Sequence, residues 1–142
     1  MATFHPYLNF NGSTEKAFLF YKSVIGGDFA YLQKFKDAPG GENMPAEEGN
    51  KIMHVALPLG GETILMGTDV GGNMQPVIMG TNFAISIAPE SDEEAHRLFN
   101  GLSAGGDVAM PLQKQFWGDT FGWFTDKFGI KWMMNYTDKK EQ

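Results

Sequence analysis

Three histidines are the side chains of this sequence with the widest range of chemistry, because imidazole can bind a metal or move a proton near neutral pH. They are His5, His54 and His96, far apart along the chain. His96 falls beside the apolar stripe of a predicted helix and is expected at the surface. His54 falls in a predicted strand, as a core histidine with satisfied hydrogen bonds or as a base in a cavity. His5 opens the first strand. Any metal site would therefore have to be assembled across strands.

A second candidate is the aromatic, glycine-rich and acidic segment 116–122, which contains Trp117 and Asp119. One interpretation is a pocket wall that carries a single anionic group. The other is the entry to a strand, where Asp119 caps a turn. The sequence leaves the two interpretations open.

The sequence motifs of several common enzyme reactions are absent from this sequence or lie in the wrong structural context. Ser103 lies in a Gly-x-Ser-x-Gly pattern, but a predicted helix precedes it where a nucleophile elbow requires a strand. The Walker A loop, the Rossmann glycine fingerprint and the HExxH pair do not occur in the sequence. Hydride transfer and ATP chemistry are therefore not indicated.

Composition narrows the class of protein further. The 142 residues have a formal net charge of −6 and include no cysteine, which excludes disulfides, zinc thiolates and thiol nucleophiles. An acidic surface repels phosphate backbones, so nucleic acid is not expected as a partner. No apolar run approaches the roughly 18 residues of a membrane span. Since 1–10 do not resemble a secretory signal, we predict a soluble, cytoplasmic protein without a membrane partner.

The elements that must position these residues repeat once along the chain. Residues 13–17 resemble 91–95, and a Gly-Gly-Asp follows each segment at a similar distance. Each half reads as a strand, a helix and three more strands. Ser13 is the expected helix N-cap in the first half, and Ser91 with Glu94 forms an expected capping box in the second. The predicted strands are 5–10, 29–35, 51–59 and 62–67, then 82–87, 108–110, 116–124 and 130–136, with glycine-rich loops at 37–50 and 69–80.

Three segments of this pattern resemble the PhnB-like branch of the vicinal oxygen chelate superfamily. They are 7–12 with Ala17, Phe20, Tyr21 and Gly26 after it, 116–119, and 126–133, the most specific of the three. The superfamily includes glyoxalase I, bleomycin-resistance and fosfomycin-resistance proteins and extradiol dioxygenases. The resemblance implies an α+β fold, in which two tandem βαβββ modules form an open curled barrel around a cavity. We predict one domain over 1–142, with module one at 1–69, a linker loop at 70–80 and module two at 81–137.

The resemblance also implies where a metal would be held, since the metal enzymes of the superfamily take ligands from the first and last strands of each module. The corresponding positions here are His5, Met66, Asn82 and Met133. Two thioethers and an amide are poor ligands for hard divalent ions. We therefore predict no cofactor and a metal-independent module that binds a small molecule. The alternative is a metal-dependent lyase, transferase or dioxygenase of glyoxalase type, with His5 as one ligand and His54 or Asp119 as replacements.

The candidate cavity residues come from the chemistry of the side chains and from the positions that the resemblance implies. They are His5, Tyr7, His54, Met66, Asn82, Trp117, Asp119 and Met133, with Trp132 competing with Met133 because adjacent strand residues face opposite sides. We also predict a homodimer, as is common in the superfamily. A third hypothesis is a structural or regulatory homodimer that has no ligand.

Overall fold

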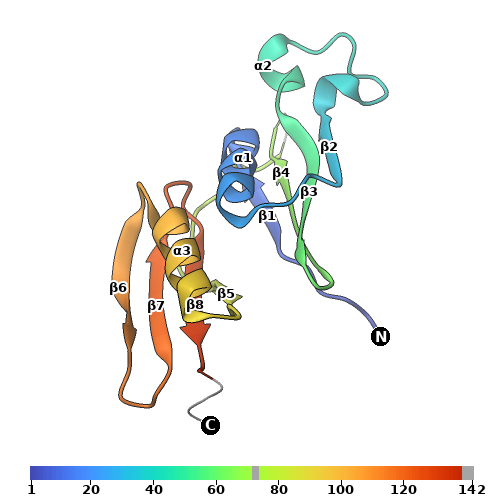
Figure 1. The fold of residues 1–142 in the computed structure, drawn as a ribbon. Helices are drawn as coiled ribbons and strands as arrows, with labels where there is room; N and C mark the ends of the chain where they lie inside the picture. Colours follow the sequence, from blue (N-terminus) through green and yellow to red (C-terminus); the bar gives the residue numbers. More distant parts are fainter. Residues whose placement is uncertain (72–73, 139–142) are drawn as a thin grey trace. The chain divides into compact units, whose positions relative to one another are not determined.

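The computed structural model describes residues 1–71 and 74–138 and divides the chain into two compact units, 1–78 and 79–142. The predicted linker 70–80 includes residues 72 and 73, which lie outside the described residues. Each unit contains one four-stranded sheet and one long helix, in the predicted order βαβββ (Figure 1). The two open sheets confirm the predicted fold class. That both units form a single domain stays a prediction.

The first unit has the strand order β1-β4-β3-β2. Strands β1 and β4 run parallel, and the other neighbours are antiparallel. This order brings the N-terminal strand beside the last strand of the unit. The elements are β1 (Tyr7–Phe10), α1 (Thr14–Ile25), β2 (Tyr31–Lys34), the 3-10 helix η1 (Phe35–Asp37), α2 (Ala46–Gly49), β3 (Ile52–Gly60) and β4 (Thr63–Asp69).

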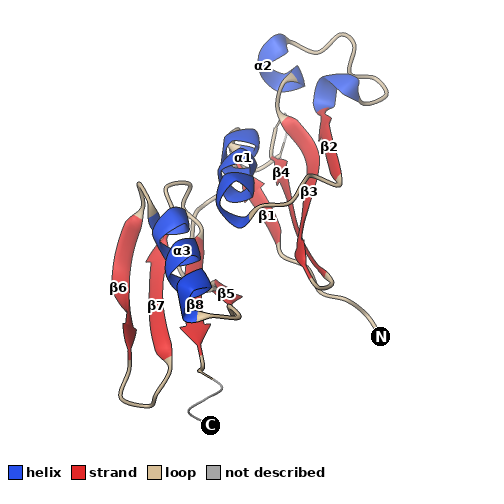
Figure 2. Cartoon of the chain, viewed as in Figure 1, coloured by secondary structure: helices blue, strands red, loops and turns tan. Residues whose placement is uncertain are grey.

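The second unit repeats this topology with the order β5-β8-β7-β6, in which β5 and β8 are the parallel pair. Helix α3 packs against β6, β7 and β8 (Figure 2). The elements are β5 (Ile85–Ile87), α3 (Asp92–Ser103), β6 (Asp107–Lys114), β7 (Thr120–Thr125) and β8 (Lys131–Tyr136).

In each unit the helix covers one face of the sheet and buries the apolar residues of that face. The apolar residues of α3, which are Ala95, Leu98, Phe99 and Leu102, are buried, and the Phe99 ring lies 4.9 Å from that of Phe124 on β7. In α1 the buried residues include Ala17, Phe18 and Tyr21. Because strand side chains alternate, the residues between the buried ones lie on the opposite, open face of each sheet.

Helix capping differs between the two units. Ser91 accepts a hydrogen bond from the Glu94 backbone N–H at 3.0 Å, which confirms one half of the predicted capping box. The other half differs, because the Glu94 carboxylate accepts from the Glu90 N–H at 3.0 Å and not from that of Ser91. Ser13 precedes α1 but makes no capping hydrogen bond with its side chain. The carboxylate of Asp69 on β4 accepts from the Thr14 backbone N–H at 3.1 Å instead. The cap of α1 therefore comes from a residue 55 positions away.

Several predicted boundaries were wrong. The strand expected from His5 begins at Tyr7, and the strand expected from Asn82 begins at Ile85, so both candidate residues precede their strands. The expected strand 116–124 begins only at Thr120, because 116–119 form the hairpin turn that follows a longer β6. The Gly118 N–H donates to the Gln115 carbonyl and the Gln115 N–H to the Asp119 carbonyl, which closes this turn. The expected loop 37–50 contains the short helix α2. None of the helices in the described residues has the length and hydropathy that crossing a membrane requires.

Candidate functional site

The open face of the first sheet carries a row of side chains that crosses all four strands. Tyr7 on β1 pairs with Met66 on β4, Met66 pairs with Ala56 on β3, and Ala56 pairs with Tyr31 on β2. Paired residues point to the same face of a sheet. Two large aromatic side chains therefore flank this face, and a thioether and a buried alanine lie between them.

His54 connects the two tyrosines. Its Nδ1 shares a hydrogen bond of 3.1 Å with the Tyr7 hydroxyl, and its ring centroid lies 5.6 Å from that of Tyr7. The Tyr31 ring lies 5.5 Å away. Tyr7 and Tyr31 are 44% and 47% exposed, so these three rings form a cluster that solvent can reach. We call them the Tyr7–His54–Tyr31 cluster. His54 is therefore not an enclosed core histidine. The structure brings it together with Tyr7, another of the predicted site residues.

Tyr31 and its neighbour Gln33 were not among the candidates from the sequence. The Tyr31 hydroxyl donates a hydrogen bond of 2.5 Å to Gln33 Oε1, and Gln33 pairs with His54 across the strands. The available signal was alternation in 29–35, which places Tyr31 and Gln33 on one face. That signal does not say which face is open.

His5 lies at the edge of this sheet, and both of its ring nitrogens have partners. The Ile64 backbone N–H donates to Nδ1 at 3.0 Å, and Nε2 lies 3.2 Å from the Thr3 hydroxyl. A histidine whose Nδ1 accepts a hydrogen bond carries its proton on Nε2 and offers no free lone pair to a metal. The ligand set that the resemblance implies also fails on the chemistry of its donors, because Met66 supplies only a thioether.

The remaining predicted ligands belong to the second unit. Asn82 lies in an exposed bend before β5. Met133 pairs with Ser86 and Trp123 on the open face of the second sheet. Within residues 1–71 and 74–138, no three His, Cys, Asp or Glu side chains gather in a way that could hold a metal ion. The implied set of one imidazole, one amide and two thioethers does not fit the hard divalent metal that the superfamily's enzymes use.

The choice between Trp132 and Met133 is resolved by burial. Trp132 is 1% exposed on the α3 side of the sheet, so Met133 is the one on the open face. Its pair partner Trp123, which sequence reasoning missed, lies under the Lys131 ammonium, whose Nζ is 4.1 Å from the ring centroid. Adjacent strand residues face opposite sides of a sheet, so the burial of Phe124 under α3 places Trp123 on the open face. This alternation was the signal that could have identified Trp123.

The structure places Trp117 and Asp119 at the β6–β7 hairpin. Trp117 is half exposed in the turn, with its ring 5.0 Å from Phe116 and 6.3 Å from Phe121. The Asp119 carboxylate accepts a hydrogen bond of 3.1 Å from the Asn135 side chain on β8. Asp119 closes the turn through its backbone carbonyl rather than its carboxylate. His96 is on the surface of α3, as predicted, next to Asp92.

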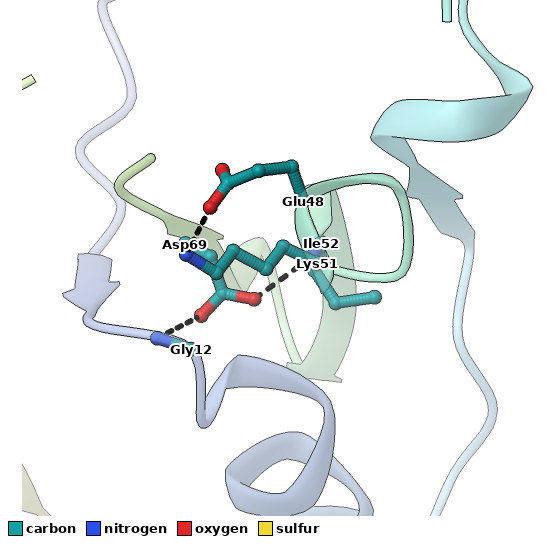
Figure 3. Close-up of polar contacts among 5 residues, drawn as sticks. All are labelled: Gly12, Glu48, Lys51, Ile52 and Asp69. Carbon is teal, nitrogen blue, oxygen red and sulfur yellow. Dashed lines mark hydrogen bonds and ion pairs between the residues drawn. The ribbon is translucent and has the colours of Figure 1, made fainter. Parts of the chain in front are cut away.

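Asp69 is a buried carboxylate that the sequence did not single out. Its Oδ1 accepts from the Gly12 N–H at 2.9 Å and from the Thr14 N–H and hydroxyl at 3.1 and 2.6 Å. Its Oδ2 accepts from the Ile52 N–H at 2.8 Å, so the carboxylate joins the start of α1 to β3 (Figure 3). Lys51, beside it, pairs with Glu48 rather than with Asp69. Four donors on a side chain that is 1% exposed indicate a structural role.

Comparisons with known proteins agree with this fold. The protein PA1353 from Pseudomonas aeruginosa is 39% identical, with a TM-score of 0.84 over 96% of this chain and 98% of that one. A PhnB protein from Bacillus cereus is 26% identical, with a TM-score of 0.75 over 96% and 100% of the two chains. Protein YjdN from Escherichia coli is 30% identical, and the match covers 92% of each chain.

More distant structures share the fold alone. A glyoxalase-related enzyme from Fulvimarina pelagi is 15% identical, with a TM-score of 0.65 over 96% of this chain and 88% of that one. The family model described as 3-demethylubiquinone-9 3-methyltransferase matches residues 2–135. The chain therefore belongs to this family, which agrees with the PhnB-like resemblance of its sequence, and it has the fold of the glyoxalase/bleomycin-resistance proteins.

Proposed function

We propose that this protein is a metal-independent module that binds a small, partly aromatic molecule on the open face of the first sheet. The observation that carries the proposal is the Tyr7–His54–Tyr31 cluster. Three rings gather on a face that no helix of their unit covers, while the other face holds the core under α1. Ligand sites combine aromatic walls with a few placed polar groups, and the cluster supplies both.

The metal-dependent alternative requires His5 to release a ring nitrogen. That release would break the hydrogen bond from Ile64 or the contact with Thr3. Replacement ligands do not complete a set. His54 Nδ1 is engaged by Tyr7, which leaves only Nε2 as a donor, and the Asp119 carboxylate accepts from Asn135. One free imidazole nitrogen is fewer than the three or four ligands that such a metal site needs. The binding module is therefore the better-supported function.

The first part of the test is metal analysis of protein that was purified without an affinity tag or chelator. We expect less than about 0.1 equivalent of zinc, nickel, manganese or iron per chain, because structural and catalytic sites of this kind need three or four good ligands. The His5→Ala variant should have the same metal content. Near-stoichiometric metal that disappears in His5→Ala would instead favour a glyoxalase-type enzyme.

The second part is a thermal-shift screen of small molecules. A ligand that binds only the folded state, at about 100 times its Kd, stabilises the protein by about 2.7 kcal/mol. We expect hits whose stabilisation is lost in Tyr31→Ser and kept in Phe116→Ser, a control that also removes an exposed aromatic ring. The absence of hits from a broad aromatic library would favour the hypothesis of a dimer without a ligand.

The homodimer and the cytoplasmic location stay predictions that belong to this proposal. Strand β2 is an edge of the first sheet and exposes Tyr31 and Leu32, and edge strands of this kind invite pairing with another chain. We expect sedimentation at micromolar concentration to show a species of twice the 15.7 kDa chain mass. A monomer alone would contradict it.

A further inference from the structure

We infer that the Tyr7–His54–Tyr31 cluster selects uncharged aromatic ligands over anionic ones, and that His54 Nε2 is the atom that forms a hydrogen bond with their polar group. This inference rests on the proposed function and specifies its ligand class. It follows from three features of the open face of the first sheet, namely its charge, its free hydrogen-bonding atom and its rings.

The first feature is the lack of a counter-charge. The side chains that the strand pairing places around the cluster carry no ammonium, guanidinium or carboxylate group; they are Asn9, Gln33, Ala56, Met66 and Thr68. The nearby Lys34 on β2 pairs with Glu15 of α1 at 3.7 Å. Removing a carboxylate or phosphate from water without a cationic partner is costly, and the net charge of −6 adds long-range repulsion.

The second feature is the free nitrogen of His54. Nδ1 is engaged by the Tyr7 hydroxyl, whereas no hydrogen bond joins Nε2 to any residue in the described part of the chain. No buried side-chain nitrogen or oxygen among the described residues lacks a partner, so Nε2 is open to solvent. When the Tyr7 hydroxyl donates to Nδ1, Nε2 carries the proton and donates to a ligand carbonyl. When Nδ1 donates to Tyr7 instead, Nε2 accepts from an N–H or O–H group.

The third feature is the pair of rings beside that nitrogen. The Tyr7 and Tyr31 rings lie within 5.6 Å of the imidazole centroid, so a ligand that bonds to Nε2 lies beside aromatic faces and edges. Planar rings pack well in such surroundings, at centroid distances of about 4.5–7 Å. The three features together describe a planar aromatic ring with one neutral polar group.

Benzamide and benzoate test the inference, because they have the same shape and differ in charge at one group. Each is titrated to 10 mM at pH 7.5, with the ring proton NMR signals of His54, Tyr7 and Tyr31 as the readout. We expect benzamide to shift these signals with a Kd at least tenfold lower than that of benzoate. The variant His54→Phe keeps a ring but removes both nitrogens, and it should raise the Kd for benzamide at least fivefold.

Two control variants distinguish the loss of the hydrogen bond between His54 Nε2 and the ligand from a general disturbance of the fold. His96→Phe makes the same chemical change on α3 and should leave the Kd for benzamide unchanged. Tyr7→Phe frees Nδ1 but leaves Nε2 available, so a rise of no more than about threefold is expected. Thermal unfolding of each variant checks that it is folded.

The remaining outcomes count against the inference. Benzoate that binds as tightly as benzamide would overturn it, and so would a failure of both probes to shift the cluster signals by 10 mM. Either result leaves the proposed function to the broader thermal-shift screen, in which charged hits whose stabilisation is lost in Tyr31→Ser would still support it, whereas hits unaffected by Tyr31→Ser would contradict it.

Discussion

Replacing Asp69 with asparagine is expected to lower the free energy of unfolding by about 2–4 kcal/mol, because a buried carboxylate would lose its strongest hydrogen bonds. The carboxylate accepts from four donors on Gly12, Thr14 and Ile52. An amide keeps one oxygen for the donors at Oδ1, but its NH2 group would face the Ile52 N–H, donor against donor. The three bonds that remain also lose their charge assistance.

Chemical denaturation followed by circular dichroism measures this change, and the melting temperature should fall by roughly 6–15 °C. The matched control is Asp28→Asn, which makes the same change where the side chain is 93% exposed and pairs with Lys22 at 3.4 Å. Exposed pairs contribute little, so the control should unfold close to the wild type. A loss at Asp69 no larger than that of the control would show that the four contacts do not hold α1 to the sheet.

The order of elements could be predicted from the sequence because each half repeats the same periodicities. Leu8 and Phe10 alternate with Tyr7 and Asn9, and the structure buries the first pair and exposes the second. The apolar stripe of the second helix was equally clear. The hairpin 116–119 was misassigned because its aromatic residues have high strand propensity, whereas Gly118 adopts φ +101°, a conformation that ends a strand.

The candidate site was harder to predict because it depends on strand order. Tyr7 and His54 are 47 residues apart in the sequence. They meet only because β4 pairs with both β1 and β3 and lies between these two strands in the sheet. Asp69 was missed since the predicted strand 62–67 ended before it, which made it look like a loop residue. The faces of Trp132 and Met133 depend on register, and a shift of one residue would exchange them.

The segment 126–133 carried the most specific part of the resemblance, and its contacts explain its residue types without any catalytic role. Asp126 Oδ1 accepts from the Phe128 and Ile130 backbone N–H groups, which shapes the turn between β7 and β8. Asp126 Oδ2 accepts from the Trp132 indole N–H at 2.8 Å. Gly129 takes φ +95°, where a side chain would be strained. The motif therefore anchors β8 under α3, and this anchoring turns Met133 toward the open face.

A double-mutant cycle of Asp126→Asn and Trp132→Phe measures that anchor. Asparagine keeps an oxygen for the turn but presents NH2 toward the indole, and phenylalanine removes the indole N–H. Each single variant should lower the free energy of unfolding by about 2–3 kcal/mol, since a buried donor or a buried charge loses its partner. The double variant should lose about 1–2 kcal/mol less than the sum, because the contact between the two side chains can be lost only once.

The control cycle combines Asp126→Asn with Trp117→Phe, the same aromatic change at a half-exposed position in the β6–β7 turn. Its coupling energy should be below about 0.5 kcal/mol, as for residues without a shared contact. Equal coupling in the two cycles would contradict a specific bond between Asp126 and Trp132. If the bond is the anchor, ligands found in the thermal-shift screen should still bind to folded Asp126→Asn, because the motif acts on the stability of the second sheet while the proposed binding face lies on the first.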